Sequence, residues 1–390
     1  MSEPNSDSAS ELLHIKTTAA AVAQAHLAPR AAEIDREGRW PHENFQALAQ
    51  AGLLGLTVPR QFGGLGQGFT GLVTVVQELA RACSSTALCY GMHCVASKVL
   101  SVCPTPGQAH RYLEPIARGE HVTTLALSEP GTGVHFYLPR VSFHPENNVF
   151  VVNGTKTFVS NGGHADSYVI SVVAEGAEYD PGTFSTLVVD ADAAGVEWQE
   201  SWEGLGMRGN ASRGVRLRDV RVPSANLLGR EGDETWHLFE VVAPYFQAAM
   251  AAVYAGIASA AVNLTASHLR ERRYAHTERP LGETELLTHR LGELWIAADS
   301  AWAYVLHAAR LGDLQGLQAR SSLMACKSRA VEAAVHVTNE ALTLAGGRAF
   351  AADHPLSRLL RDARAGHVMA PSTDLLKHWI GRLSLDLPLL

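Results

Sequence analysis

The sequence has no concentrated run of positive charge and no cluster of metal-binding side chains. Its 32 Lys and Arg residues stand against 39 Asp and Glu residues in 390, for a formal net charge of −7. A nucleic-acid-binding surface needs concentrated positive charge, so nucleic acid is not expected to be a main partner. No His/Cys group has the spacing of metal ligands, and no metal is expected. No Gly-x-Ser-x-Gly motif occurs either, which argues against serine nucleophile chemistry.

Long apolar runs and paired cysteines are also missing. We identify no apolar stretch of the ~18 residues typical of a membrane span, so no membrane contact is expected. The five cysteines include no Cys-x-x-Cys pair, and small buried thiols on helices are their expected role. Their odd number and the absence of a signal peptide predict a cytoplasmic protein.

The periodicity of the apolar residues changes twice along the chain. Residues 1–120 and 233–390 have helical spacing, whereas residues 121–232 contain short segments rich in Val, Thr and Phe between turn residues. No long helical pattern interrupts the middle region, so its strands are expected to be mainly antiparallel. The prediction is an α+β fold with an N-terminal helical domain, a central antiparallel β domain and a C-terminal four-helix bundle.

Several segments, in sequence order, resemble one protein family. They read AGLLGLTVPRQFGGLG, LALSEPGTG, NGTKTFVSNGGHAD, GLGMRGNASRGVRLRDVRVP, ALTLAGGRAF and PLSRLLRDAR. Their order and spacing cover nearly the whole chain and resemble the acyl-CoA dehydrogenases. The resemblance implies an oxidoreductase that binds FAD and transfers hydride to it from an acyl thioester.

The resemblance assigns contacts with the flavin ring to two of these segments. SEPGTG offers a hydroxyl beside glycines, including Gly133, where a planar ring or a phosphate can approach closely. Leu127 and Ser128 correspond to contacts with the pyrimidine edge of the ring. Ser160 corresponds to a donor toward the reactive nitrogen, and Phe158 to an aromatic residue packed on the ring. Taken alone, each segment is more typical of a hairpin turn.

The diphosphate of FAD is expected to meet an arginine. Arg272 corresponds to an arginine that, in the family, reaches the diphosphate across a subunit interface, a task that suits a guanidinium fork. The usual Phe-Gly that follows it is replaced by Ala275-His276. Arg270 and Arg273 are nearby alternatives, and a solvated helix face is the competing interpretation.

A glycine turn is expected to contact the same cofactor from a neighbouring chain. Ala345, Gly346 and Gly347 match the turn that has this role in the family. The resemblance therefore implies a homodimer or a homotetramer.

The carboxylate that usually removes the α-proton is missing. In most of the family it lies in a Tyr-Glu-Gly-Thr-type motif, and here GHVMAPSTDLL places Ala370 at its position. A minority of the family takes its base from the long bundle helix, where this chain has Phe246, followed by Gln247 in place of the usual arginine. Val134 also replaces a hydroxyl that helps to bind a phosphate-bearing partner. These four positions are the expected substrate contacts.

Four residues are candidates for the missing base: Glu240, Asp374, His135 and His367. A base must lie within hydrogen-bonding reach of the substrate in a partly dry pocket. Each candidate has a structural alternative: a solvated helix face for Glu240, a helix-start carboxylate for Asp374, and a structural role for either histidine.

Three functions compete. The first is an acyl-CoA dehydrogenase with a relocated base, acting on an acyl-CoA or acyl-carrier thioester and passing electrons to an electron-transfer flavoprotein. The second is a flavin-dependent monooxygenase or oxidase, because the reaction of reduced flavin with O2 needs no α-proton base. The third is an acyl-thioester-binding module with non-catalytic FAD, against which the retained Ser128 and Ser160 count. We favour the first.

Overall fold

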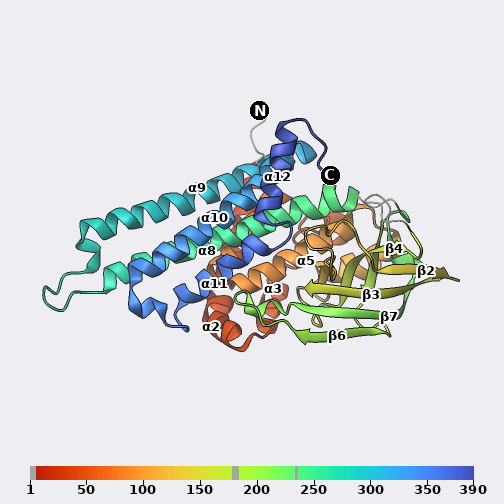
Figure 1. Cartoon of the computed structure of the whole chain (residues 1–390), viewed down its shortest axis with the longest axis horizontal. Coiled ribbons are helices and arrows are strands. Elements are labelled where there is room, and N and C mark those ends of the chain that lie inside the picture. Colours follow the sequence, from red (N-terminus) through yellow and green to blue (C-terminus); the bar gives the residue numbers. More distant parts are fainter. Residues whose placement is uncertain (1–5, 178–183, 233–235) are drawn as a thin grey trace.

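The computed structural model describes residues 6–177, 184–232 and 236–390. The elements follow the predicted order of helices, strands and helices. The sheet occupies one end of the elongated molecule, and long helices extend from it toward the other end (Figure 1). The last helix before the sheet ends at Ala117 and the first strand begins at Thr123, on either side of the predicted boundary at 120. The predicted boundary at 232/233 adjoins residues 233–235, which lie outside the described residues.

The N-terminal region is helical, as predicted. α5 is buried along almost its whole length, and a single extended residue, Cys83, separates it from α4. Cys103 is exposed, whereas the other four cysteines are buried as expected, and burial raises the pKa of the Cys94 and Cys326 thiols to about 12. The helices are α1 (Ser6–Val22), α2 (Ala28–Glu37), α3 (His42–Gln50), α4 (Phe69–Ala82), α5 (Ser84–Val102), α6 (Pro106–Gln108) and α7 (Glu114–Ala117).

The middle region forms an eight-stranded sheet of order β6-β7-β3-β2-β4-β5-β8, with β1 paired to β4. Most pairs are antiparallel, as predicted, but β1·β4 and β2·β4 are parallel. The sheet has its own apolar core, which includes Phe143, Phe150 and Leu187. The strands are β1 (Thr123–Ala126), β2 (Ser142–Glu146), β3 (Val149–Val159), β4 (Ser167–Ala174), β5 (Phe184–Asp190), β6 (Val196–Ser201), β7 (Arg213–Pro223) and β8 (Leu227–Leu228).

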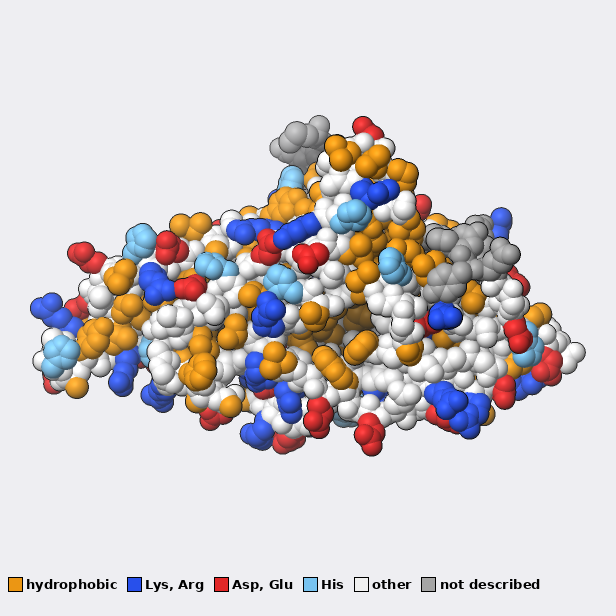
Figure 2. All heavy atoms as spheres, viewed as in Figure 1, with side chains coloured by type: hydrophobic (Ala, Val, Ile, Leu, Met, Phe, Trp, Pro, Cys, Tyr) orange, Lys and Arg blue, Asp and Glu red, His pale blue; other side chains and the backbone are white. Residues whose placement is uncertain are grey.

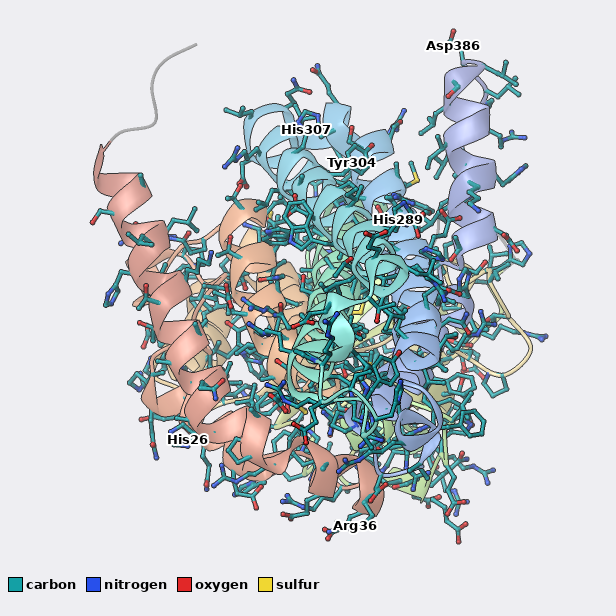
Figure 3. The ribbon with its side chains drawn as sticks, turned by 90° about the vertical axis from the view of Figure 1, so that its left-hand side faces the viewer. His26, Arg36, His289, Tyr304, His307 and Asp386 are labelled. Atoms are coloured by element: carbon teal, nitrogen blue, oxygen red, sulfur yellow. The ribbon has the colours of Figure 1, made fainter. Side chains whose placement is uncertain are left out.

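The C-terminal region is a helical bundle built around α8. Seen from the end opposite the sheet, α1 and α12 flank the bundle on its two sides (Figure 3). The many alanines of α8 let α4, α5, α9 and α10 approach it closely. The helices are α8 (Ala243–Glu271), α9 (Glu285–Gln315), α10 (Arg320–Ala345), α11 (Pro355–Val368) and α12 (Thr373–Ser384).

The sequence analysis was wrong to find no apolar stretch as long as a membrane span. The continuous helical segment His237–Glu271, which includes α8, is long and apolar enough to cross a membrane by length and composition. The apolar window of this segment is entirely buried inside the protein. Its hydropathy therefore reflects a core helix packed on all sides.

A buried ion pair joins the loop after β1 to the middle of β3. The Lys156 Nζ atom lies 2.6 Å from the Glu129 carboxylate, and both side chains are almost completely buried. Lys156 also donates to the Ser171 carbonyl, while Glu129 accepts the backbone N–H groups of Arg140 and Val141. These extra hydrogen bonds offset the desolvation of the two charges.

Replacing Lys156 with methionine should lower the free energy of unfolding by ~3–5 kcal/mol, because it leaves the Glu129 carboxylate buried without its partner. Urea denaturation followed by circular dichroism measures the loss. The matched control is Arg221→Met on the same sheet. This change removes an ion pair with Glu146 whose side chains are 55% and 46% exposed, and it should leave stability nearly unchanged. Similar losses in the two variants would contradict this account.

Candidate functional site

A cavity, here called the inner cavity, lies between the sheet and the first turn of α8. The side of the molecule seen in Figure 2 is hollowed between the sheet and the helices, and hydrophobic side chains line the hollow. The inner cavity brings together five residues predicted from the sequence: Leu127, Ser128, Phe158, Phe246 and Ala370. Its other lining residues are Met92, Leu125, Phe136, Val242, Ala243 and Pro371.

The two segments expected to face a flavin are in direct contact. The Thr157 N–H donates to the Ser128 carbonyl at 2.8 Å. Within the described part of the chain, the hydroxyls of Ser128 and Ser160 have no hydrogen-bond partner. Phe158 is 61% exposed and meets the ring of Trp202 edge-on. Free hydroxyls beside an exposed aromatic surface fit a planar, hydrogen-bonding group, so these residues suit the isoalloxazine ring of FAD.

The glycine loop after β1 leads from these residues to the cavity wall. Gly133 has a φ of 55° and is exposed, and Val134 is 37% exposed. The His135 Nδ1 lies 2.6 Å from the Tyr137 hydroxyl, while the intervening Phe136 lines the inner cavity. The hydrogen bond to Tyr137 engages one ring nitrogen of His135 at the surface.

A buried lysine that the sequence analysis overlooked holds the loop that carries Ala370. The Nζ atom of Lys327 donates to the Met369 carbonyl at 3.0 Å and to the Pro371 carbonyl at 2.6 Å, on either side of Ala370. It also lies 5.6 Å from the centre of the Phe246 ring. Among the described residues no carboxylate pairs with Lys327, and burial lowers its pKa to about 7. In the sequence Lys327 is followed directly by Ser328 and Arg329, so nothing there distinguishes it from an ordinary surface lysine.

The four candidate bases lie outside the lining of the inner cavity. Asp374 is exposed in the first turn of α12. His367 is half-buried near the end of α11, and burial, together with the charge of Arg364, lowers its pKa. Glu240 is exposed and lines a second cavity.

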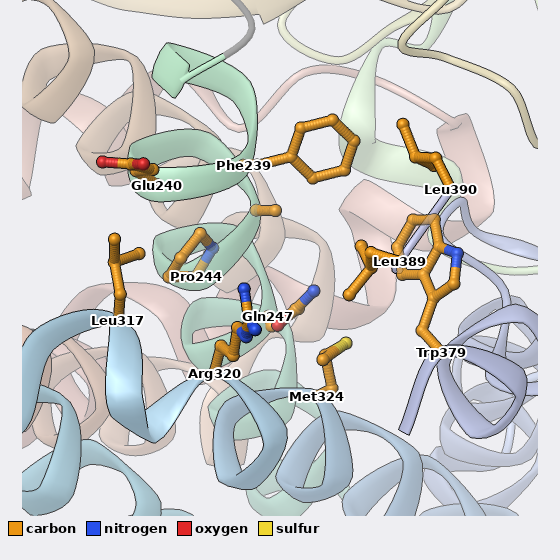
Figure 4. A pocket seen from close by; sticks show the side chains of 11 residues that line it. Phe239, Glu240, Pro244, Gln247, Leu317, Arg320, Met324, Trp379, Leu389 and Leu390 are labelled. Atoms are coloured by element: carbon orange, nitrogen blue, oxygen red, sulfur yellow. The ribbon is translucent and has the colours of Figure 1, made fainter. Parts of the chain in front are cut away.

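This second cavity, here called the outer cavity, lies between the start of α8, the start of α10, and α12 with the C-terminal residues (Figure 4). It shares Ala243 with the inner cavity, so the two adjoin at this residue. Gln247 faces the outer cavity, whereas its neighbour Phe246 faces the inner one. The remaining lining residues are Phe239, Glu240, Pro244, Leu317, Arg320, Met324, Trp379, Leu389 and Leu390.

The residues expected to meet the diphosphate lie at the far end of the bundle. Arg272 follows the last turn of α8 and is exposed, and residues 345–347 form the turn after α10, with Gly346 at a φ of 71°. Burial lowers the pKa of His268, and the positive charges of Arg272 and Arg348 lower it further. This end of the molecule therefore carries two neighbouring guanidinium groups, which suit a diphosphate.

A single chain cannot bring this end and the inner cavity to the same cofactor. Phe246 lies in the first turn of α8 and Arg272 just beyond its last turn, about 40 Å apart at the helical rise per residue. That separation exceeds the length of a dinucleotide. If Arg272 contacts FAD, it contacts the FAD bound to a second copy of the chain.

Lys327 should make stability depend on pH in a defined window. The unfolded chain keeps this proton up to the ordinary pKa of 10.5, whereas the folded protein releases it at about 7. Wild-type stability relative to Lys327→Met should therefore rise between these pH values, by at most about 1.4 kcal/mol per pH unit. Denaturation of both proteins at pH 6.5, 8 and 9.5 measures the difference. Lys16→Met, at a half-exposed lysine of α1, is the control. Its free energy of unfolding should differ from that of the wild type by the same amount at all three pH values. A constant difference for Lys327→Met would show that its amine keeps an ordinary pKa.

Comparisons with known proteins identify the family along the whole chain. The acyl-CoA dehydrogenase N-terminal domain model matches residues 9–120, the middle domain model residues 124–220, and the C-terminal domain model residues 242–384. The acryloyl-CoA reductase (NADH) of Anaerotignum propionicum is 31% identical over 373 residues, which are 94% of this chain and 93% of that protein. The short-chain-specific acyl-CoA dehydrogenase of Clostridium acetobutylicum is 28% identical, over 91% and 93% of the two chains.

Solved structures show the same fold. Butyryl-CoA dehydrogenase from Megasphaera elsdenii superimposes with a TM-score of 0.91 at 21% identity, over 99% of this chain and 100% of that one. The FAD complex of PigA superimposes with a TM-score of 0.88 at 19% identity, over 99% and 100% of the two chains. On the evidence of three consecutive domain matches and this common fold, the chain belongs to the acyl-CoA dehydrogenase family.

Proposed function

We propose that this FAD-dependent oxidoreductase removes the α- and β-hydrogens of an acyl thioester at the inner cavity. One observation carries the proposal: Ser128 and Phe158, from the two flavin-edge segments, line the same cavity as Phe246 and Ala370, from the two segments expected to face the substrate. FAD, when bound, accepts the β-hydrogen as hydride. The chain itself supplies the apolar walls that exclude water and the hydroxyls that orient the ring.

The size of the inner cavity favours a short acyl group. Its volume is about 70 Å³, against about 210 Å³ for the outer cavity. Met92, Phe136 and Phe246 narrow it. The names of similar proteins point the same way, because they specify acryloyl-CoA, short-chain acyl-CoA and butyryl-CoA.

We assign acceptance of the α-proton to Glu240. Among the four candidate bases it is the one that lines a cavity adjoining the reaction site, because the outer cavity meets the inner one at Ala243. The arrangement is less direct than a carboxylate at position 370, since a general base works best within hydrogen-bonding reach of the proton that it removes.

Self-association completes the proposal. The distance between the inner cavity and Arg272 requires a second chain if that arginine contacts FAD. α9 offers an apolar surface for such contacts, since Leu286, Trp295 and Ile296 are 66%, 56% and 63% exposed. We therefore propose that the protein is a homodimer or a homotetramer.

We also propose that it is located in the cytoplasm and that an electron-transfer flavoprotein accepts its electrons.

Anaerobic titration of the flavin-loaded protein with acyl-CoA thioesters tests the proposed reaction. Propionyl-CoA and butyryl-CoA should bleach the visible flavin absorbance without any added reductant, and palmitoyl-CoA should not, because the inner cavity is small. The reverse reaction, reoxidation of the reduced flavin by acryloyl-CoA or crotonyl-CoA, should also occur.

A flavin that stays oxidised with every saturated thioester, and stays reduced with every unsaturated one, would contradict the proposal. If the reduced protein then consumed O2 and hydroxylated a substrate, the monooxygenase interpretation would replace it.

Restoring a carboxylate at position 370 should accelerate flavin reduction. Ala370→Glu places a base in the inner cavity, and stopped-flow reduction by butyryl-CoA should be faster than in the wild type by roughly 10²-fold. Ala370→Gln has the same size without the basic oxygen and should give no acceleration. Equal rates in the Glu and Gln variants would mean that an efficient base already acts in the wild type.

A further inference from the structure

The Ser160 hydroxyl, expected at the edge of the flavin ring, belongs to a strained piece of backbone. Phe158, two residues before it, and Asn161, directly after it, have φ values of 53° and 58°, in the left-handed region. Asparagine tolerates this conformation, whereas a bulky aromatic residue is rarely found in it. Such residues cluster at ligand-binding sites and persist only where surrounding contacts fix them. The contacts that fix this turn therefore bear on the position of the hydroxyl.

The peptide group that joins Ser160 to Asn161 is held at both ends. The Ser160 carbonyl accepts a hydrogen bond from the Thr124 hydroxyl of β1 at 3.1 Å. The Asn161 N–H donates to the Asn210 carbonyl at 3.0 Å. Because a peptide group is planar, these two bonds fix its orientation. The backbone of Ser160 is therefore anchored on its C-terminal side.

The side chain of Asn161 extends this anchoring to the N-terminal helices. Asn161 is fully buried, and its amide forms hydrogen bonds in two directions. The Nδ2 atom donates to the Cys89 carbonyl of α5 at 3.0 Å, and Oδ1 accepts the indole N–H of Trp40 at 2.8 Å. A buried amide is stable where its donor and its acceptor both find partners. One side chain thus ties the turn after β3 to two N-terminal segments.

Trp40 is itself held in place by ring stacking. It lies between α2 and α3 and is 9% exposed. Its ring stacks on that of Phe45 in α3, with the ring centres 4.7 Å apart. It also stacks on the ring of His164, in the turn after β3, with the centres 4.9 Å apart and the planes within 3° of parallel. These contacts set the plane of the indole, so Trp40 presents its N–H to Asn161 in a fixed direction.

We propose that Asn161 and Trp40 are positioning residues for FAD, which hold the Ser160 hydroxyl where it can hydrogen-bond to the edge of the flavin ring. They act through the peptide group between residues 160 and 161, because neither side chain lines the inner cavity. The inference rests on the proposed function, since it takes Ser160 as a flavin contact. It adds that the N-terminal helical region sets the geometry of a contact made from the end of a strand.

A double-mutant cycle on FAD binding tests the inference without requiring turnover. The full-length flavin-loaded protein is diluted, and the fluorescence of the released flavin gives the dissociation constant. Ser160→Ala removes the hydroxyl and should weaken FAD binding roughly tenfold. Trp40→Phe keeps an aromatic ring in the stack but removes the N–H, and Asn161→Gly keeps the left-handed backbone but removes the amide. Each should weaken FAD binding by about threefold to tenfold, and should move the visible absorption band of the bound flavin in the same direction as Ser160→Ala.

The decisive measurement repeats both substitutions in a Ser160→Ala background. If Trp40 and Asn161 act through the Ser160 hydroxyl, replacing them should have no further effect once the hydroxyl is gone. Substitutions that only loosen the structure would weaken FAD binding equally in both backgrounds, and this result would overturn the inference. An unchanged dissociation constant in Ser160→Ala, or in both Trp40→Phe and Asn161→Gly, would overturn it as well.

Two further measurements complete the test. Trp302→Phe, at a half-buried tryptophan of α9, is the control and should bind FAD like the wild type. Urea denaturation shows whether each variant is folded, and Trp40→Phe, the smallest change, carries the test if Asn161→Gly does not fold. If the cycle gives the expected result but acyl thioesters never reduce the flavin, the proposed reaction fails and the inference stands.

Discussion

The ion pair between Lys156 and Glu129 is the constraint on which the site depends. Two charges with almost no exposure are stable only if each finds its partner and further hydrogen bonds, and both do so here. Glu129 directly follows Leu127 and Ser128, and Lys156 precedes Phe158 by two residues. The pair therefore holds two segments that are distant in sequence at one edge of the inner cavity, where the hydroxyl of Ser128 remains free for a ligand.

α8 is the second constraint, because it connects all parts of the proposed site. Its alanine-rich surface lets neighbouring helices pack against it on every side, so its first turn is held firmly between the two cavities. Phe246 and Gln247 are adjacent in sequence but face different cavities, since successive helical residues point about 100° apart. The same helix carries Arg272 about 40 Å away, which makes the site of one chain incomplete if that arginine serves FAD.

Much of the fold and part of the site could be predicted from the sequence, for identifiable reasons. Ser128 and Phe158 lie in glycine-containing segments, and the sequence carries a signal for them because Gly131 and Gly133 have φ values of 84° and 55°, which favour glycine. Lys327 and Arg320 are two of the three Lys and Arg residues of α10. Only the packing of distant segments shows that Lys327 supports the Ala370 loop and that Arg320 lines the same cavity as Gln247. The parallel pairing of β1 and β2 with β4 was missed because alternation along a strand does not specify its neighbours.

The most direct test of the central claim, that the two flavin-edge segments and the Ala370 loop build one reaction site, is a crystal structure with FAD and a butyryl-CoA thioether. The account predicts the edge of the flavin ring at Ser128 and Ser160. The acyl carbons should lie between the ring and Phe246, with Ala370 beside them. A flavin bound away from these hydroxyls, or an acyl group outside the inner cavity, would contradict it.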